Sequence, residues 1–121
     1  MSAARAVFES PEMPANPASS ARPVDLDHLA RQTMGDTALE AEVLTMFARQ
    51  VRVCLQDIAE NAEGRKALAH KLKGAAAAIG AFGVAEAAGA VEAGQDDAAT
   101  LARLSAAVVE AEHFILKLMR S

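Results

Sequence analysis

Apolar residues recur along most of this chain at steps of three and four, the spacing that places side chains on one face of an α-helix. The longest such run carries Leu39, Val43, Met46, Phe47, Val51, Cys54, Leu55 and Ile58. The most regular run carries Leu101, Leu104, Val108, Ala111, Ile115 and Leu118. No stretch shows the two-residue alternation of a half-buried strand, so the pattern predicts an all-α protein.

Capping residues and glycines divide the chain into five predicted helices. The expected N-caps are Asp25 or Asp27, Asp36 or Thr37, and Asp96 or Asp97. The expected ends and turns are Gly35, Asn61 with Gly64, Gly80 with Gly83, and Gly94. The short first helix carries Leu26, Leu29 and Met34. The third, from about residue 65 to 79, is expected to bury Leu68, Leu72, Ala75, Ala76 and Ile79. The short fourth helix carries Val84, Ala87, Ala88 and Val91.

The connections between these helices are short, which makes consecutive helices antiparallel neighbours. We therefore expect an up-down-up-down antiparallel four-helix bundle whose short extra N-terminal helix covers one end. All four prolines lie within the first 23 residues. The expected organisation is a flexible tail over residues 1–23 and a bundle domain over 24–121, with a short docking segment around Val7 and Phe8 as the alternative for the tail.

Composition narrows the class of protein further. The chain has 121 residues, a net charge of −4, 3% aromatic residues and one cysteine, Cys54. A mild acidic balance with few aromatics argues against nucleic-acid binding, and one cysteine excludes an internal disulfide framework. No apolar run is long enough to span a membrane, and no signal peptide opens the sequence. We expect a soluble, cytoplasmic, monomeric domain.

One histidine is expected to face solvent from the middle of the third helix. His70 lies two residues from both Leu68 and Leu72, which places it about 160° around the helix from each. Lys66, Lys73, Gly74 and Ala77 share its face.

Cys54 lies on the apolar stripe of the predicted second helix, and packing alone explains its position.

Two features of this face suggest chemistry. Gly74 costs about 0.5–1 kcal/mol relative to alanine inside a helix. Together with Ala77 it leaves the imidazole of His70 unobstructed. Lys66 and Lys73 supply positive charge on both sides, which suits a phosphoryl group on the ring. On spacing alone, an incidental histidine on a lysine-bearing surface explains the pattern equally well.

The residues from His70 to Ala81, His-Lys-Leu-Lys-Gly-Ala-Ala-Ala-Ala-Ile-Gly-Ala, resemble the signature of histidine-containing phosphotransfer (Hpt) domains. That signature is His-x-Leu-Lys-Gly, then small residues and an aliphatic-Gly pair. The resemblance extends over about residues 24 to 118. It departs from the family at Ala75, where many members have serine. Glu92 and Gln95 are candidates for the polar residue that some members offer the imidazole from the next helix.

The resemblance implies that His70 is the phosphoacceptor. From the charges and spacing around it, we expect Lys73 and secondarily Lys66 to stabilise the phosphoryl group and Gly74 to give access to the ring. The implied partners are response-regulator receiver domains and a sensor histidine kinase. The chain has no Gly-rich or Walker-type phosphate loop and no acidic cluster for Mg²⁺. We therefore expect a phosphocarrier rather than an enzyme, without a cofactor of its own, whose partner receiver supplies Mg²⁺ and the aspartate.

Two other functions compete with phosphotransfer. A helical adaptor would bind a receiver or kinase without chemistry, although it would not need His70, Lys73 and Gly74. Glu110-x-x-His113 has the spacing used in di-iron bundles, but such a site needs two of these motifs, and His113 is expected to face water. His28 is expected to be a surface or end-packing residue.

Overall fold

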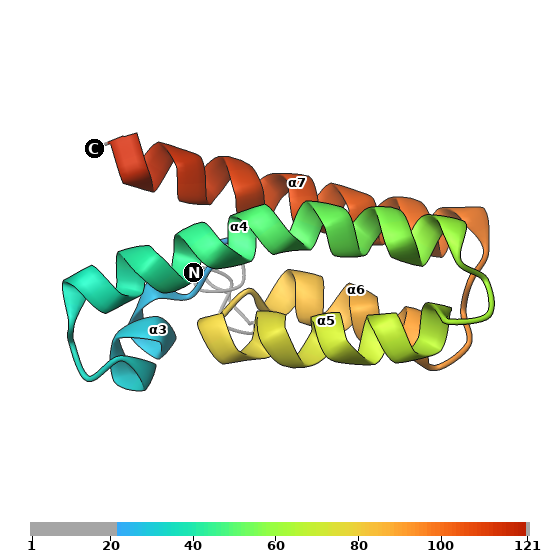
Figure 1. Ribbon diagram of the computed structural model, residues 1–121, viewed down its shortest axis with the longest axis horizontal. Coiled ribbons are helices and arrows are strands. Elements are labelled where there is room, and N and C mark those ends of the chain that lie inside the picture. Colours follow the sequence, from blue (N-terminus) through green and yellow to red (C-terminus); the bar gives the residue numbers. More distant parts are fainter. Residues whose placement is uncertain (1–21, 121) are drawn as a thin grey trace, which may run out of the picture.

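The computed structural model describes residues 22–120 and folds them into five α-helices (Figure 1). They are α3 (Leu26–Gln32), α4 (Thr37–Glu60), α5 (Arg65–Ile79), α6 (Phe82–Glu92) and α7 (Ala98–Arg120). Each of the four longer helices packs on the next, and α7 packs back on α4, which closes the ring of the bundle. Over the described residues, the predicted all-α bundle with a short additional N-terminal helix is confirmed.

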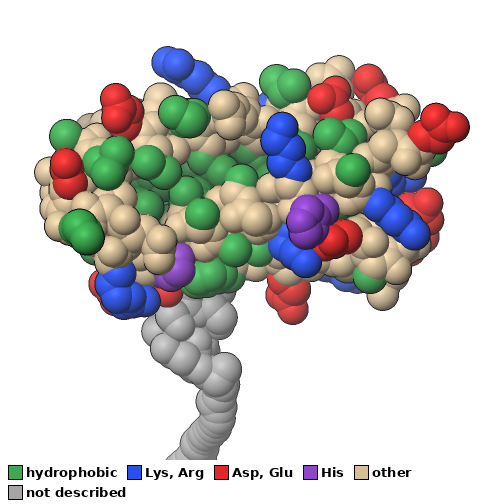
Figure 2. Space-filling view, turned by 60° about the horizontal axis from the view of Figure 1, so that its bottom comes forward, with side chains coloured by type: hydrophobic (Ala, Val, Ile, Leu, Met, Phe, Trp, Pro, Cys, Tyr) green, Lys and Arg blue, Asp and Glu red, His purple; other side chains and the backbone are tan. Residues whose placement is uncertain are grey.

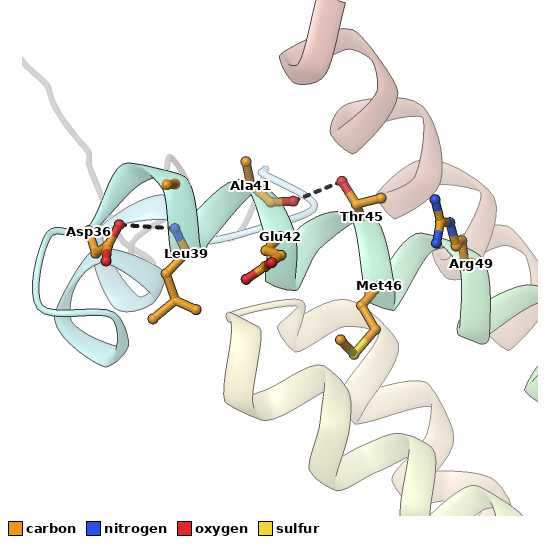
Figure 3. Close-up of a pocket in the computed structure, with 8 residues that line it drawn as sticks. Asp36, Leu39, Ala41, Glu42, Thr45, Met46 and Arg49 are labelled. Atoms are coloured by element: carbon orange, nitrogen blue, oxygen red, sulfur yellow. Dashed lines mark hydrogen bonds between the residues drawn. The ribbon is translucent and has the colours of Figure 1, made fainter.

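Aspartates begin the first two helices. The side chain of Asp25 accepts the backbone N–H of His28 at 3.1 Å, and that of Asp36 accepts the N–H of Leu39 at 3.0 Å (Figure 3). Each satisfies a donor that the first turn of a helix would leave unpaired. The sequence offered two candidates at each of these positions, and the structure selects the earlier one.

Glycine ends α5 and lets α3 pack against its end. Gly80 has φ 87°, in the left-handed region that glycine adopts without strain. Its carbonyl oxygen accepts the backbone N–H of Asp25 at 2.9 Å. A Cβ on Gly80 would lie 2.7 Å from the carbonyl oxygen of Asp25, so a larger residue would push the two helices apart.

The core runs between the four bundle helices and under α3. Its largest fully buried side chains include Leu29, Leu44, Ile58, Leu104 and Ile115. Most of the stripe predicted for the last helix is buried, and Leu101 and Leu118 pack against the core at its edge. The ion pair between Arg52 and Glu112 adds a polar link between α4 and α7.

Three residues predicted for apolar stripes face solvent instead. Met34 lies in the turn after α3 with φ 55° and is 94% exposed. Leu39 and Met46 are 40% and 54% exposed. These two lie about 120–140° around α4 from Val51, because the buried track passes through Leu44, which the predicted stripe omitted.

Two further predictions about α5 and α6 were wrong. Ala75 is exposed rather than buried, because the packing of α5 against its neighbours places Ala69 in the core instead. Gly83 is not part of the turn, since α6 already begins at Phe82. Gly80 makes the reversal without a second glycine. The predicted tail and the alternative at Val7 and Phe8 fall mostly on residues 1–21, outside the described residues, and stay predictions.

We expect Leu104→Ala to lower the free energy of unfolding by about 2–5 kcal/mol, because it removes a fully buried side chain and leaves a cavity. Leu116→Ala makes the same chemical change on the same helix at a position that is 55% exposed, and should stay within about 0.5 kcal/mol of the parent. Urea denaturation followed by circular dichroism measures both. Equal losses in the two variants would contradict this assignment of the α7 core face.

Candidate functional site

The site is centred on His70, which α5 holds on the surface of the bundle. Its side chain is 69% exposed, as the helical spacing predicts. The residues of α5 that point inward are Ala69, Leu72, Ala76 and Ile79. Their burial fixes the rotation of the helix, so the orientation of His70 is set by the core.

Glu92, at the end of α6, contacts the imidazole directly. Its Oε2 atom lies 2.6 Å from His70 Nδ1. Glu92 was one of two candidates for a polar partner from the next helix; the structure selects it over Gln95. The sequence alone could not choose between these two residues, because a contact between side chains 22 positions apart depends on how α5 and α6 pack.

Lys73 binds the same carboxylate. Its Nζ atom lies 2.7 Å from Glu92 Oε1, and its side chain remains 43% exposed. Glu92 therefore bridges two residues of α5 that stand one turn apart. The positive charge that the sequence places beside His70 at Lys73 is thus paired with a carboxylate that also contacts the ring.

The charge state of Glu92 decides the proton position on His70. The hydrogen bond from Lys73 lowers the pKa of the Glu92 carboxyl, and the hydrogen bond with His70 lowers it further. An ionised carboxylate can only accept hydrogen bonds, so the proton it shares with the ring belongs to Nδ1. Whenever the ring is neutral, its free lone pair is therefore on the other ring nitrogen, Nε2.

The surface of α5 beside His70 is built from small residues. A Cβ placed on Gly74 meets no atom within 4 Å, so this position opens directly to solvent. Ala67 and Ala78 are exposed on the same outward side, and Ala77 is half-buried. A second macromolecule can therefore approach the backbone of α5 closely at Gly74, one turn from the ring.

Lys66 is exposed on the same side of α5 and extends toward the turn after α6. Its Nζ lies 3.9 Å from the position that a Cβ would take on Gly94. Within residues 22–120 it forms no ion pair, whereas Lys73 does. Of the two lysines singled out in the sequence, only Lys73 is joined to the imidazole through Glu92.

A groove between α4 and α5 lies beside this surface. Its lining includes Phe47, Val53, Leu68, Lys71 and Ala75. Figure 2 shows hydrophobic side chains gathered in a hollow of a face that also carries histidine and charged side chains. The groove brings an apolar surface close to the site.

The remaining candidates have structural explanations. His28 packs its ring edge-on against Phe82, with centroids 5.1 Å apart, and so joins α3 to α6. Cys54 is half-buried, and burial raises the pKa of its thiol. His113 is exposed. Among residues 22–120, no three or more His, Cys, Asp or Glu side chains form a group that could hold a metal ion, and no helix is long and apolar enough to cross a bilayer.

These features define a helical bundle that presents a hydrogen-bonded imidazole on an open surface. Residues 42–114 match the family model described as the Hpt domain. The match covers more than half of the chain, which therefore belongs to the histidine-containing phosphotransfer domain family. Searches of curated proteins and of solved structures found no match. Membership implies histidine phosphotransfer in phosphorelays, a role that Hpt domains play as phosphocarriers rather than as enzymes.

The lowered pKa of Glu92 predicts a specific pH dependence of stability. A carboxyl whose pKa is lower in the folded state stabilises the fold above its unfolded-state pKa and loses this contribution as pH falls through the folded value. The parent should therefore be more stable than Glu92→Gln at neutral pH, and the difference should shrink toward about pH 3.

Glu86→Gln provides the control, since Glu86 is exposed on the same helix and forms no ion pair among the described residues. Thermal denaturation at a series of pH values measures all three proteins. A parent and a Glu92→Gln variant whose difference stays constant with pH would mean that the carboxylate makes no such contacts in solution.

Proposed function

We propose that this protein is a phosphorelay intermediate that accepts a phosphoryl group on His70 and passes it to or from the aspartate of response-regulator receiver domains. The observation that carries the proposal is the exposed imidazole whose Nδ1 lies 2.6 Å from an ionised carboxylate. A sensor histidine kinase is the second partner class. The protein is proposed to act in the cytoplasm as a monomer.

The reacting atom in this proposal is Nε2 of His70. Its lone pair attacks the phosphorus of an aspartyl phosphate, a P–N bond forms, the P–O bond to the aspartate breaks, and the aspartate leaves as a carboxylate. The ring becomes positively charged while Nδ1 keeps its proton. The negative charge of Glu92 favours that cationic ring, so the carboxylate stabilises the transition state and orients the imidazole.

Lys73 balances the charge of the same carboxylate. An unpaired Glu92 would repel the incoming phosphoryl group, which carries nearly two negative charges. The ammonium group 2.7 Å from Glu92 Oε1 offsets this repulsion. Lys66 adds a second positive charge on the same side of α5 in this proposal. The receiver is proposed to bring Mg²⁺ together with its aspartate.

The partner is proposed to dock over α5 and the adjoining side of α4. Gly74 leaves room for it at the ring, and the apolar residues Leu39, Met46 and Val53 repeat every seven positions along the exposed side of α4. Figure 3 shows Leu39 and Met46 directed to the same side of the helix. Because relay partners must separate quickly, we expect an interface of at most about 1,200 Å².

An adaptor that binds a receiver or kinase without phosphotransfer is the alternative. It would use the same groove and would have no need for an imidazole whose proton is fixed by a carboxylate. The contact between His70 and Glu92 therefore favours phosphotransfer over simple binding.

Incubation with a phosphorylated receiver domain and Mg²⁺ should transfer labelled phosphate to this protein as an acid-labile, base-stable phosphoramidate. His70→Gln should abolish the label and keep its helical circular dichroism spectrum, because the replaced side chain is exposed. His113→Gln, an exposed histidine on another helix, should label like the parent. Label on His70→Gln would place the acceptor elsewhere, and binding without label across a panel of receivers would favour the adaptor.

Gly74→Leu should preserve the bundle and reduce the transfer rate at least about tenfold, because a branched side chain would stand where the partner approaches the ring. Ala102→Leu, at an exposed position on α7, controls for an added surface leucine. Rapid-quench measurements over a range of receiver concentrations test this. If the Gly74→Leu variant transfers phosphate at the parent rate, access of the partner to the His70 ring does not explain the glycine at this position.

A further inference from the structure

The contact between α5 and α6 is the most extensive helix contact within residues 22–120, and several buried residues of both helices are alanines. Ala69 and Ala76 on α5 and Ala88 on α6 are completely buried. Small side chains let two helix backbones approach closely, which brings groups on one helix within reach of the other. Gly89 lies on α6 one residue after Ala88 and three residues before Glu92, and it is half-buried.

Lys73 crosses from α5 to α6 over this glycine. Its Cδ atom lies 3.4 Å from the position that a Cβ would take on Gly89. Its Nζ atom lies 2.7 Å from Glu92 Oε1, one turn further along α6. The aliphatic part of the lysine therefore passes across the backbone at Gly89 while the ammonium group reaches the carboxylate.

Among the described residues, Lys73 Cδ is the neighbouring atom within 4 Å of that Cβ position. A methyl group at residue 89 would just touch the lysine, whereas a branched side chain would occupy the space the lysine now fills. Glycine inside a helix lowers the stability of the fold relative to alanine, the residue that this chain uses most often in its helices. Room for the Lys73 side chain is a physical reason for glycine at this position.

We propose that Gly89 is a positioning residue, which holds Lys73 on Glu92 by leaving the path across α6 free. The proposal rests on the proposed phosphotransfer function, because it assigns to Gly89 an effect on the charge balance at His70. A bulky residue at 89 would move the Lys73 ammonium away from Glu92. The carboxylate would then remain beside His70 without its balancing charge.

The experiment compares Gly89→Ala, Gly89→Val and the control Gly83→Val. Gly83 lies in the first turn of the same helix, and a Cβ there meets nothing within 4 Å, so the control makes the same substitution without a contact at Cβ. The first readout is NMR, which measures two quantities. One is the nuclear Overhauser contact between the Lys73 side chain and the α-protons of Gly89, and the other is the difference in chemical shift between the two ε-protons of Lys73. Both should be present in the parent and in Gly83→Val, and the shift difference should be lost in Gly89→Val.

The second readout is the rate of phosphoryl transfer from a phosphorylated receiver. Gly89→Val should be about tenfold slower than the parent, the size expected for losing one charge-assisted contact, and Gly89→Ala should be close to the parent. In a Lys73→Ala background, Gly89→Val should cause no further loss, because the residue it acts through is gone. A merely structural effect of valine would persist in that background.

The two readouts separate the proposals. A parent that shows the Lys73–Gly89 contacts but accepts no phosphate overturns phosphotransfer and leaves the positioning of Lys73 standing. A parent without those contacts, or a Gly89→Val loss that persists without Lys73, overturns the role of Gly89 and leaves phosphotransfer untouched. Loss of both contact and rate in Gly89→Val, with Gly83→Val unchanged, supports the role of Gly89.

Discussion

The arrangement of the site depends on one carboxylate that two residues of a neighbouring helix share. Glu92 lies 2.6 Å from His70 and 2.7 Å from Lys73, so a single side chain of α6 orients the imidazole and engages the lysine. Such contacts require α5 and α6 to lie close together with fixed rotation. The buried alanines between the two helices meet that requirement, and the larger core residues hold the rest of the bundle around them.

This packing explains how a chain rich in small residues can still have a well-filled core. Leucine, isoleucine and valine fill the interior, where they contribute most of the apolar burial. Alanine and glycine lie where two backbones approach, or on the open surface where a partner is proposed to dock. Gly80 illustrates the first use, because the start of α3 packs on it, and Gly74 illustrates the open surface.

The electrostatic character of the site differs from what the sequence suggests. Lysines on the face of His70 indicate a basic patch, yet the pairing of Lys73 with Glu92 neutralises part of it. Lys66 and Lys71 remain exposed on either side of His70 along the outer face of α5. The site therefore combines a charge-balanced centre with positive flanks, an arrangement that suits the phosphoryl transfer proposed for this ring.

The sequence by itself determined the helical class, the exposed position of His70 and the limits of α5, because these follow from local periodicity and capping. It also placed most of the apolar stripe of α7 correctly. Only the tertiary structure decided that Leu44, rather than Leu39 or Met46, enters the core, since three- and four-residue steps permit more than one track along a long helix. It also decided that Glu92 reaches His70 and that Lys73 crosses Gly89. Contacts between helices depend on their separation and rotation, which come from the packing of many side chains at once and leave no local pattern in the chain.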